Sequence, residues 1–253
     1  MALTQSYEPR LFDPPEVPHS KFKRVLLKLS GEALAGDDGF GIDGQVARRF
    51  AEEIAGARRD LNVEIAVVVG GGNIWRGAEH PEMDPAQADF AGMLATVMNA
   101  LALQDHLEKL EQPTRVMSAI EMPKVAEPYI YRRAIRHMEK ERVVILAGGT
   151  GSPTFTTDTT ASLRAVELGV EVLLMAKHGV DGVYTSDPKH NPNATRYEEM
   201  DHHDLLGLGV MDGTAATHAR ANDMPMIVFD GLKHGGLEEI LIDPGKGTIV
   251  RKK

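Results

Sequence analysis

Short apolar runs alternate along this chain with longer stretches in which apolar residues recur every three or four positions. The short runs predict strands at 24–29, 65–69, 114–117, 143–146, 170–175, 226–229 and 248–251. The helical spacing predicts helices at about 43–60, 129–140, 214–222 and 237–242, and one after Asp158 that ends at Gly169. Because strands alternate with helices, we expect an α/β three-layer sandwich with a mainly parallel central sheet.

The longest predicted helix follows the strand at 65–69. Asp84 suits the N-cap position and Pro85 the first helical position, because an aspartate accepts from free N–H groups and proline has none to leave unpaired. The expected apolar face of this helix consists of Phe90, Leu94, Val97, Leu101 and Leu107, with Met93 and Met98 beside it.

Length and composition predict one globular domain. The chain has 253 residues, 42% of them hydrophobic, and we place a single domain at 21–253. Residues 1–20 are polar and resemble neither a signal nor a transit peptide, so we expect a flexible N-terminal tail. No apolar run approaches the roughly 20 residues that a membrane-spanning helix needs, so we expect no membrane contact.

Charge and cysteine content narrow the function classes. The formal net charge is −9, which argues against broad nucleic-acid binding, because that requires a basic face. The chain contains no cysteine, which excludes disulfides, thiolate zinc sites and thiol catalysis and agrees with a cytoplasmic location. An acidic protein that binds anions must gather its cations and N–H donors locally.

Three predicted strands run directly into loops of small residues. The first loop, 30–32, follows Lys28; the second, 70–73, is followed by Arg76; the third is 148–151, followed by Thr156-Thr157-Asp158. Glycines in such loops let backbone N–H groups approach an anion, and a helix that begins just afterwards adds its positive end. The carboxyl ends of parallel strands share one edge of the sheet, so we expect one phosphate-binding crevice.

Several side chains in or near the crevice have both a structural and a functional interpretation. Lys28 stands inside an apolar strand, and we favour a role in neutralising transferring phosphate oxygens over an edge lysine. Asp212 is either the N-cap of the next helix or the partner that holds such a lysine. Asp158 suits the N-cap of the helix that follows, while the hydroxyls and N–H groups just ahead of it can form a second anion site. Asp89 suits a helix N-terminus but could also accept hydrogen bonds from ribose hydroxyls.

Two familiar sequence motifs do not indicate a function in this chain. The run 39–44 matches G-x-G-x-x-G but lies well beyond its strand, whereas a dinucleotide-binding turn must follow the strand directly, and no G-x-x-x-x-G-K-[ST] pattern occurs. His202-His203-Asp204 lacks metal-ligand spacing, so we expect a solvated helix start there.

These residues resemble the amino-acid-kinase superfamily and, within it, the bacterial UMP kinases, over nearly all of 23–250. The resemblance is carried by Leu26-Leu27-Lys28-Leu29-Ser30-Gly31-Glu32-Ala33-Leu34, Gly70-Gly71-Gly72-Asn73 with Arg76-Gly77, Gly92-Met93-Leu94-Ala95-Thr96-Val97-Met98-Asn99, Phe155-Thr156-Thr157-Asp158, and Val180-Asp181-Gly182-Val183-Tyr184 with Asp187-Pro188. It implies ATP-dependent phosphorylation of UMP to UDP in pyrimidine nucleotide biosynthesis, with Mg²⁺, by a homohexameric allosteric enzyme.

The resemblance also implies a role for each site residue. The ATP set is Lys28, Leu29, Ser30, Gly31, Gly72, Arg76, Tyr184 and Asp187. The UMP set is Gly71, Asp89, Thr150, Gly151, Ser152, Pro153, Thr154, Phe155, Thr156 and Thr157. The catalytic set is Lys28, Arg76, Asp158 and Asp212, with Asp212 orienting Lys28. No protein side chain is assigned to the metal.

Two departures from the family pattern bear on nucleotide binding. The stretch 176–180 is one residue longer than is usual, where a threonine often contacts ATP, so that contact is not expected. At the family's GTP site Arg115 and Arg142 keep basic character, but Gln104 and Glu108 stand at positions that are often basic. We therefore expect weak or absent GTP activation, while inhibition by UTP stays open.

Two other functions remain as alternatives. One is a kinase of the same fold that acts on a carboxylate or carbamate, which should lack the sequence context of Asp89. The other is a non-catalytic relative that binds oxyanions, which should have lost Lys28 or Asp212.

Overall fold

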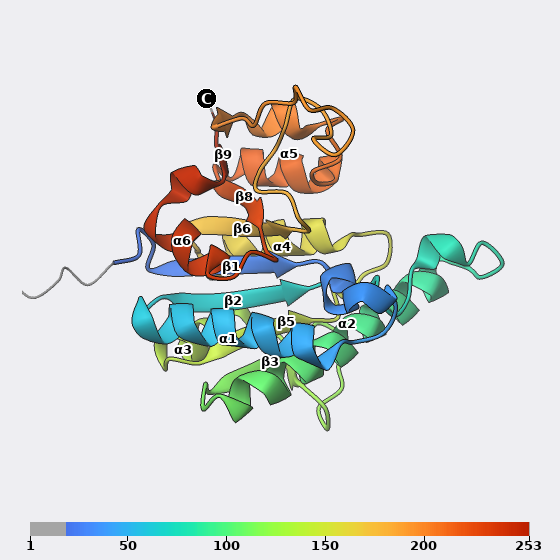
Figure 1. Cartoon of the computed structure of the whole chain (residues 1–253). Helices are drawn as coiled ribbons and strands as arrows, with labels where there is room; N and C mark the ends of the chain where they lie inside the picture. Colours follow the sequence, from blue (N-terminus) through green and yellow to red (C-terminus); the bar gives the residue numbers. More distant parts are fainter. Residues whose placement is uncertain (1–18, 253) are drawn as a thin grey trace, which may run out of the picture.

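The computed structural model describes residues 19–252, so the predicted tail lies, except for its last two residues, outside the described part. Its centre is a nine-stranded sheet of order β4-β3-β5-β2-β1-β6-β8-β9-β7 (Figure 1). The strands are β1 Arg24–Leu29, β2 Glu64–Val69, β3 Thr114–Ser118, β4 Glu127–Pro128, β5 Val143–Ala147, β6 Val172–Lys177, β7 Glu199–Met200, β8 Met226–Asp230 and β9 Thr248–Val250. Only the β8–β9 pairing is antiparallel. The predicted mainly parallel sheet is confirmed.

Helices cover both faces of the sheet, as predicted (Figure 1). One face carries α1 Gly44–Asp60, α2 Pro85–Lys109 and α6 Gly236–Ile242; the other carries α3 Tyr131–Glu139, α4 Thr157–Leu168 and α5 Gly213–Ala221. Alternate residues of β1 divide between the two cores, Leu27 and Leu29 facing α1 and Leu26 facing α4. Lys28 has the parity of Leu26, so the strand itself directs the lysine toward the α4 side.

Short 3₁₀ helices fill several connections, and their bounds are Gly31–Leu34, Gly36–Asp38, Gly77–Glu79, His202–Leu205 and Pro244–Lys246. Of the three small-residue loops, only the third leads into an α-helix; the first leads into a 3₁₀ helix and the second into a turn.

Side-chain caps begin the main helices where the sequence placed them. Asp43 accepts from two N–H groups at the start of α1, and Asp84 with Pro85 opens α2. At α4 the N-cap is Thr156, whose hydroxyl accepts from the N–H groups of Asp158 and Thr159. The N-cap interpretation of Asp158 is therefore wrong, and its carboxylate is left for other contacts.

The structure corrects three further expectations. Strand β6 begins two residues later than predicted, because residues 170 and 171 form the turn after α4. On α2, Leu94 and Met98 are about half exposed, and the buried face instead runs through Met93, Val97, Ala100, Leu103 and Leu107. His202 is buried and its Nε2 lies 2.7 Å from the Met224 carbonyl oxygen, whereas His203 and Asp204 are exposed, so this helix start is only partly solvated.

No helix within residues 19–252 is long and apolar enough to cross a membrane.

Candidate active site

Lys28 forms an ion pair at the carboxyl end of β1. Its Nζ lies 2.9 Å from Asp158 Oδ1, and both side chains are more than four-fifths buried. The partner comes from the first turn of α4, where the Thr156 cap leaves the Asp158 carboxylate free to face β1. Burying a lysine without a counter-charge would be costly, so the pair fixes the ammonium at the end of the sheet.

The second loop lies beside the first. The N–H of Gly70 donates to the carbonyl of Leu29, and a Cβ on Gly31 would lie 2.7 Å from the carbonyl oxygen of Gly70. Glycine at position 31 is therefore required by the close approach of the two loops.

Arg76 projects from the end of the second loop and is partly exposed. It hydrogen-bonds to Glu32 beside the first loop and lies 3.7 Å from Glu79. Both partners are exposed carboxylates, so these pairs are weak and an anionic ligand can replace them.

The third loop is shaped by unusual backbone angles. Gly148, Gly149 and Gly151 have φ of +75°, +60° and +83°, and a Cβ on Gly148 would lie 2.9 Å from Ser118 Oγ. Thr154 also has positive φ, +70°, and its N–H donates to Asp89 Oδ2 at 2.7 Å. Asp89 thereby ties the third loop to the start of α2.

A pocket of about 440 Å³ lies between the second and third loops and α2, and we call it the Asp89 pocket. Trp75, Met93 and Phe155 supply apolar walls, while Arg76 and Asp89 supply charges of opposite sign. Of the predicted UMP set, Gly71, Asp89, Phe155, Thr156 and Thr157 line it. The other five, Thr150, Gly151, Ser152, Pro153 and Thr154, belong to the same loop but do not line it.

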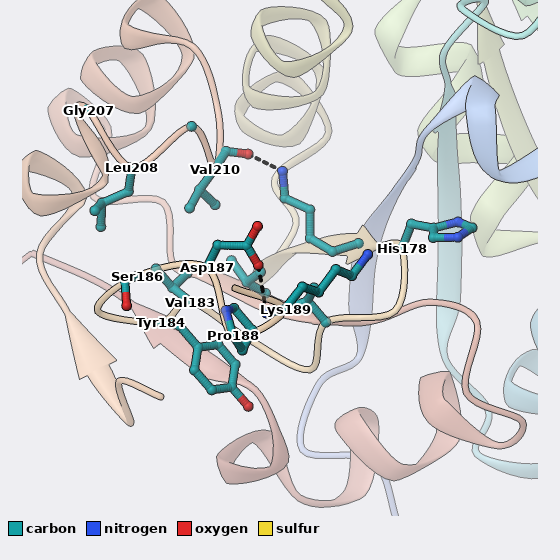
Figure 2. A pocket seen from close by; sticks show the side chains of 15 residues that line it. His178, Val183, Tyr184, Ser186, Asp187, Pro188, Lys189, Gly207, Leu208 and Val210 are labelled. Atoms are coloured by element: carbon teal, nitrogen blue, oxygen red, sulfur yellow. Dashed lines mark hydrogen bonds between the residues drawn. The ribbon is translucent and has the colours of Figure 1, made fainter. Parts of the chain in front are cut away.

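A second pocket, of about 540 Å³, lies at the end of β6, and we call it the Tyr184 pocket (Figure 2). Its lining combines the loop after β6, including Tyr184 and Asp187, with the segment 207–210 before α5. The side chain of Tyr184 donates to Asp181, which raises the pKa of the tyrosine. The Lys189 N–H donates to Asp187, and this bond together with His190 lowers the pKa of that carboxyl.

Lys177 is a site residue that the sequence reasoning missed. It ends β6 next to β1, lines the Tyr184 pocket and donates to the Val210 carbonyl. Burial and then the charge of Lys28 lower the pKa of Lys177, while Asp158 opposes the shift. The signal that indicated Lys28, a lysine that follows apolar residues in a strand, was also present at Lys177.

The structure shows no ion pair between Asp212 and Lys28, so the orienting role of Asp212 stays a prediction. Among the described carboxylates, only Asp158 lies within ion-pair distance of Lys28. Asp212 caps α5 by accepting from the Ala215 N–H, and it also accepts from the hydroxyls of Thr156 and Thr159 on α4. It therefore joins two helix starts at the edge of the site.

Of Leu29 only the backbone could face the predicted ATP site, because its side chain is buried in the core between β1 and α1. Lys28, Ser30 and Gly31 lie at the end of β1, while Gly72 and Arg76 line the Asp89 pocket.

The predicted effector arginines lie away from both pockets. One carboxylate oxygen of Glu127 lies 3.5 Å from Arg115 Nε, and the other lies 3.1 Å from His137 Nε2. Arg142 lies 2.9 Å from the other nitrogen of His137. Arg115 and Gln104 line a pocket of about 270 Å³ with Lys124 and Glu127. Internal acidic and imidazole partners thus already engage both arginines.

Within the described residues no group of three or more histidines and carboxylates could hold a metal ion. The hard oxygen donors nearest Lys28 are those of Asp158, which suit a magnesium ion that keeps most of its ligands from water and phosphate.

Comparison with known proteins gives consistent similarities. A model of the amino acid kinase family matches residues 23–230. The uridylate kinase of Deinococcus radiodurans is 56% identical over 92% of this chain and 96% of its own, and that of Pediococcus pentosaceus is 54% identical over 91% and 97%. The solved structure of UMP kinase from Bacillus anthracis matches with a TM-score of 0.87 at 39% identity over 92% of this chain and 97% of that chain. UMP kinase from Ureaplasma parvum matches with 0.85 at 40% over 91% and 99%.

Proposed function

We propose that this chain transfers the γ-phosphoryl group of ATP to UMP, because it belongs to the amino acid kinase family and within it to the uridylate kinases. The observation that carries this proposal is the Lys28–Asp158 pair between two pockets. Asp158 follows Thr157 of the Asp89 pocket, and the charge of Lys28 acts on Lys177 of the Tyr184 pocket. Two nucleotides bound there would direct their phosphates toward the same lysine.

The Asp89 pocket is the proposed UMP site. The carboxylate of Asp89 can accept from ribose hydroxyls while one oxygen keeps its bond to the Thr154 N–H. Trp75, Met93 and Phe155 offer apolar surface for the base. The α-phosphate would then lie toward Arg76 and the N–H groups of the second loop.

The Tyr184 pocket is the proposed site for the adenosine of ATP. It is the larger and more open of the two, and Lys177 stands at its inner end. The triphosphate would extend from there along the first and second loops, where backbone N–H groups and Lys28 meet the β- and γ-phosphates.

Transfer is a direct in-line displacement. An oxygen of the UMP phosphate forms a bond to the γ-phosphorus while the bond from that phosphorus to the β,γ-bridging oxygen breaks, and ADP leaves with the electron pair. The residues contribute position and positive charge: Lys28 and Lys177 lie between the two pockets, and Arg76 approaches from the second loop. Asp158 holds the Lys28 ammonium at the transfer point.

Magnesium accompanies ATP in this proposal and supplies charge neutralisation on the phosphates. Asp158 is the protein group suited to contact it, directly or through water. Asp212 supports the site from α5 rather than through Lys28, because its oxygens accept from Thr156, Thr159 and the Ala215 N–H.

The alternatives are less well supported. A kinase for a small carboxylate or carbamate has no need of the apolar, Asp89-bearing pocket, and an oxyanion-binding relative has no need of the Lys28–Asp158 pair. The homohexamer, inhibition by UTP, weak GTP activation and the cytoplasmic location stay predictions.

A substrate panel tests the function. The purified chain is incubated with Mg-ATP and each of UMP, dUMP, CMP, AMP, carbamate and N-acetylglutamate, and ADP formation is measured. We expect turnover with UMP well above that with the others, and Lys28→Ala is the matched inactive control. Turnover with a carboxylate or carbamate but not with UMP would overturn the proposal.

A further inference from the structure

Two asparagines, one from the second loop 70–73 and one from α2, meet in the interior, and the proposed reaction uses neither of them. Asn73 is 1% exposed and Asn99 is 0% exposed. Neither side chain lines the Asp89 pocket or the Tyr184 pocket. Buried amides need partners, so their contacts show what they hold.

The two side-chain amides bond to each other reciprocally. Asn73 Nδ2 donates to Asn99 Oδ1 at 3.0 Å, and Asn99 Nδ2 donates to Asn73 Oδ1 at 2.7 Å. The second N–H of Asn99 donates to the Gly70 carbonyl at 2.7 Å, and that of Asn73 donates to the Gly41 carbonyl at 2.6 Å. All four amide N–H groups are thus paired.

The pair joins α2 to the first two loops. Asn99 on α2 holds Gly70 directly, and the Oδ1 of Asn73 lies where a Cβ on Gly31 would be 2.7 Å away. The segment at Gly41 is held from both sides, because its N–H also donates to the Asn73 carbonyl at 2.8 Å. A shift of the amide pair would therefore move the turns after both β1 and β2.

The same helix also holds the third loop. Thr96, one turn before Asn99, accepts from the Gly148 N–H at 2.8 Å and donates to the Met93 carbonyl at 2.7 Å. Residues three apart on a helix share a face. This face of α2 thus contacts all three loops, the first of them through Asn73.

We propose that the Asn73–Asn99 pair is a positioning device, which sets the first and second phosphate loops in register with α2 and, through Thr96, with the third loop. This inference rests on the proposed phosphoryl transfer. In-line transfer depends on the relative placement of both nucleotides, and a misplacement of about 1 Å can cost about a hundredfold in rate. Losing the pair should therefore lower kcat more than it weakens the binding of either nucleotide.

The test is Asn99→Leu, which keeps the branched shape of the side chain but removes every side-chain hydrogen bond. We expect kcat to fall about tenfold to a hundredfold, with KM for ATP and for UMP changed by no more than about threefold. Leu103→Ala on the same helix is the matched control, because it removes buried packing without touching a loop. It should lower Tm and leave kcat within about twofold.

If Asn99→Leu folds poorly, a double-mutant cycle tests the same inference. Asn73→Ala and Asn99→Ala should each lower kcat, and the double variant should lose no more than the worse single one, because the pair acts as a unit.

Three results would overturn the inference: a folded Asn99→Leu protein with wild-type kcat, losses that multiply in the double variant, or losses confined to Tm. A wild-type chain that forms no UDP would instead refute the proposed function itself.

Discussion

At the scale of single residues, the site contains three cations, two paired with carboxylates and one with a backbone carbonyl. Lys28 is paired with Asp158, Arg76 with exposed Glu32 and Glu79, and Lys177 with a backbone carbonyl. The three environments differ in burial, and burial decides how strongly each charge acts on a phosphate. The environments of Lys28 and Lys177, and that of Asp89 beside the third loop, lead to the three predictions that follow.

Lys28→Ala should lower kcat by about a hundredfold or more while the fold is kept, because the lost charge acts mainly on the transition state. Steady-state kinetics with circular dichroism as a folding check measure this. Lys140→Ala, an exposed lysine at the end of α3, is the control and should behave as wild type. Near-normal turnover of Lys28→Ala would remove Lys28 from the chemistry.

Asp89→Asn should raise KM for UMP with little change in KM for ATP. One carboxylate oxygen is already engaged by the Thr154 N–H, so an amide can satisfy the loop or the ribose but not both. Asp105→Asn on the exposed face of α2 is the control. An equal rise for both substrates would contradict the assignment of the Asp89 pocket to UMP.

The pKa of Lys177 predicts a pH effect. Burial and the neighbouring Lys28 lower this pKa from its ordinary value of 10.5, so the ammonium loses its proton at a lower pH than an exposed lysine does. Because the protonated form is the one that meets phosphate, kcat/KM for ATP should fall on the alkaline side before pH 10.5. Lys177→Arg should move that limb to higher pH. An unchanged alkaline limb in this variant would show that another group titrates.

At the scale of elements, the start of α4 carries much of the site. Thr156 caps the helix, Thr157 lines the Asp89 pocket and Asp158 faces Lys28, so three consecutive residues serve three purposes. Asp212 braces this helix start against α5. The contribution of Asp212 to the stability of the fold can be measured separately from its contribution to catalysis.

Asp212→Ala should cost at least the roughly 0.5–2 kcal/mol typical of a lost N-cap, because the Ala215 N–H and two threonine hydroxyls lose their acceptor. Since Asp212 does not pair with Lys28, we expect kcat to fall less than in Lys28→Ala. Urea unfolding and kinetics measure the two effects, and Asp84→Ala, a cap away from Lys28, is the control for the cap alone. A loss of kcat as large as that of Lys28→Ala would restore the orienting role of Asp212.

At the scale of the whole molecule, the proposed effector region lies on β3, β4 and α3, on the side of the sheet remote from the Tyr184 pocket. There Glu127 engages Arg115 and His137, and His137 engages Arg142.

GTP should activate weakly or not at all. Gln104 and Glu108 replace cations in the proposed site, and Glu127 competes with a triphosphate for Arg115. Initial rates at subsaturating ATP, with GTP titrated through the physiological range, measure this. The matched variant is Glu108→Lys, which should strengthen any GTP response. Strong saturable activation of the wild-type chain at low GTP would contradict the prediction.

Much of this molecule follows from the sequence because the signals are local. Apolar runs and helical spacing determine the sheet and its helices, and Asp43, Asp84 and Pro85 begin their helices as single-residue chemistry requires. The three loops were also predictable, since each follows a buried strand and parallel strands bring their ends together.

Only the tertiary structure decided which groups meet across the sheet. Asp158 rather than Asp212 faces Lys28, because Thr156 takes the N-cap position and frees that carboxylate. Lys177 joins the site through the pairing of β6 with β1, and Asn73 meets Asn99 through the packing of α2 on the loops. The sequence by itself determined the strands, helices, loops and charges; the pairing of side chains 20 or more positions apart depended on strand order and packing, which no local pattern encodes.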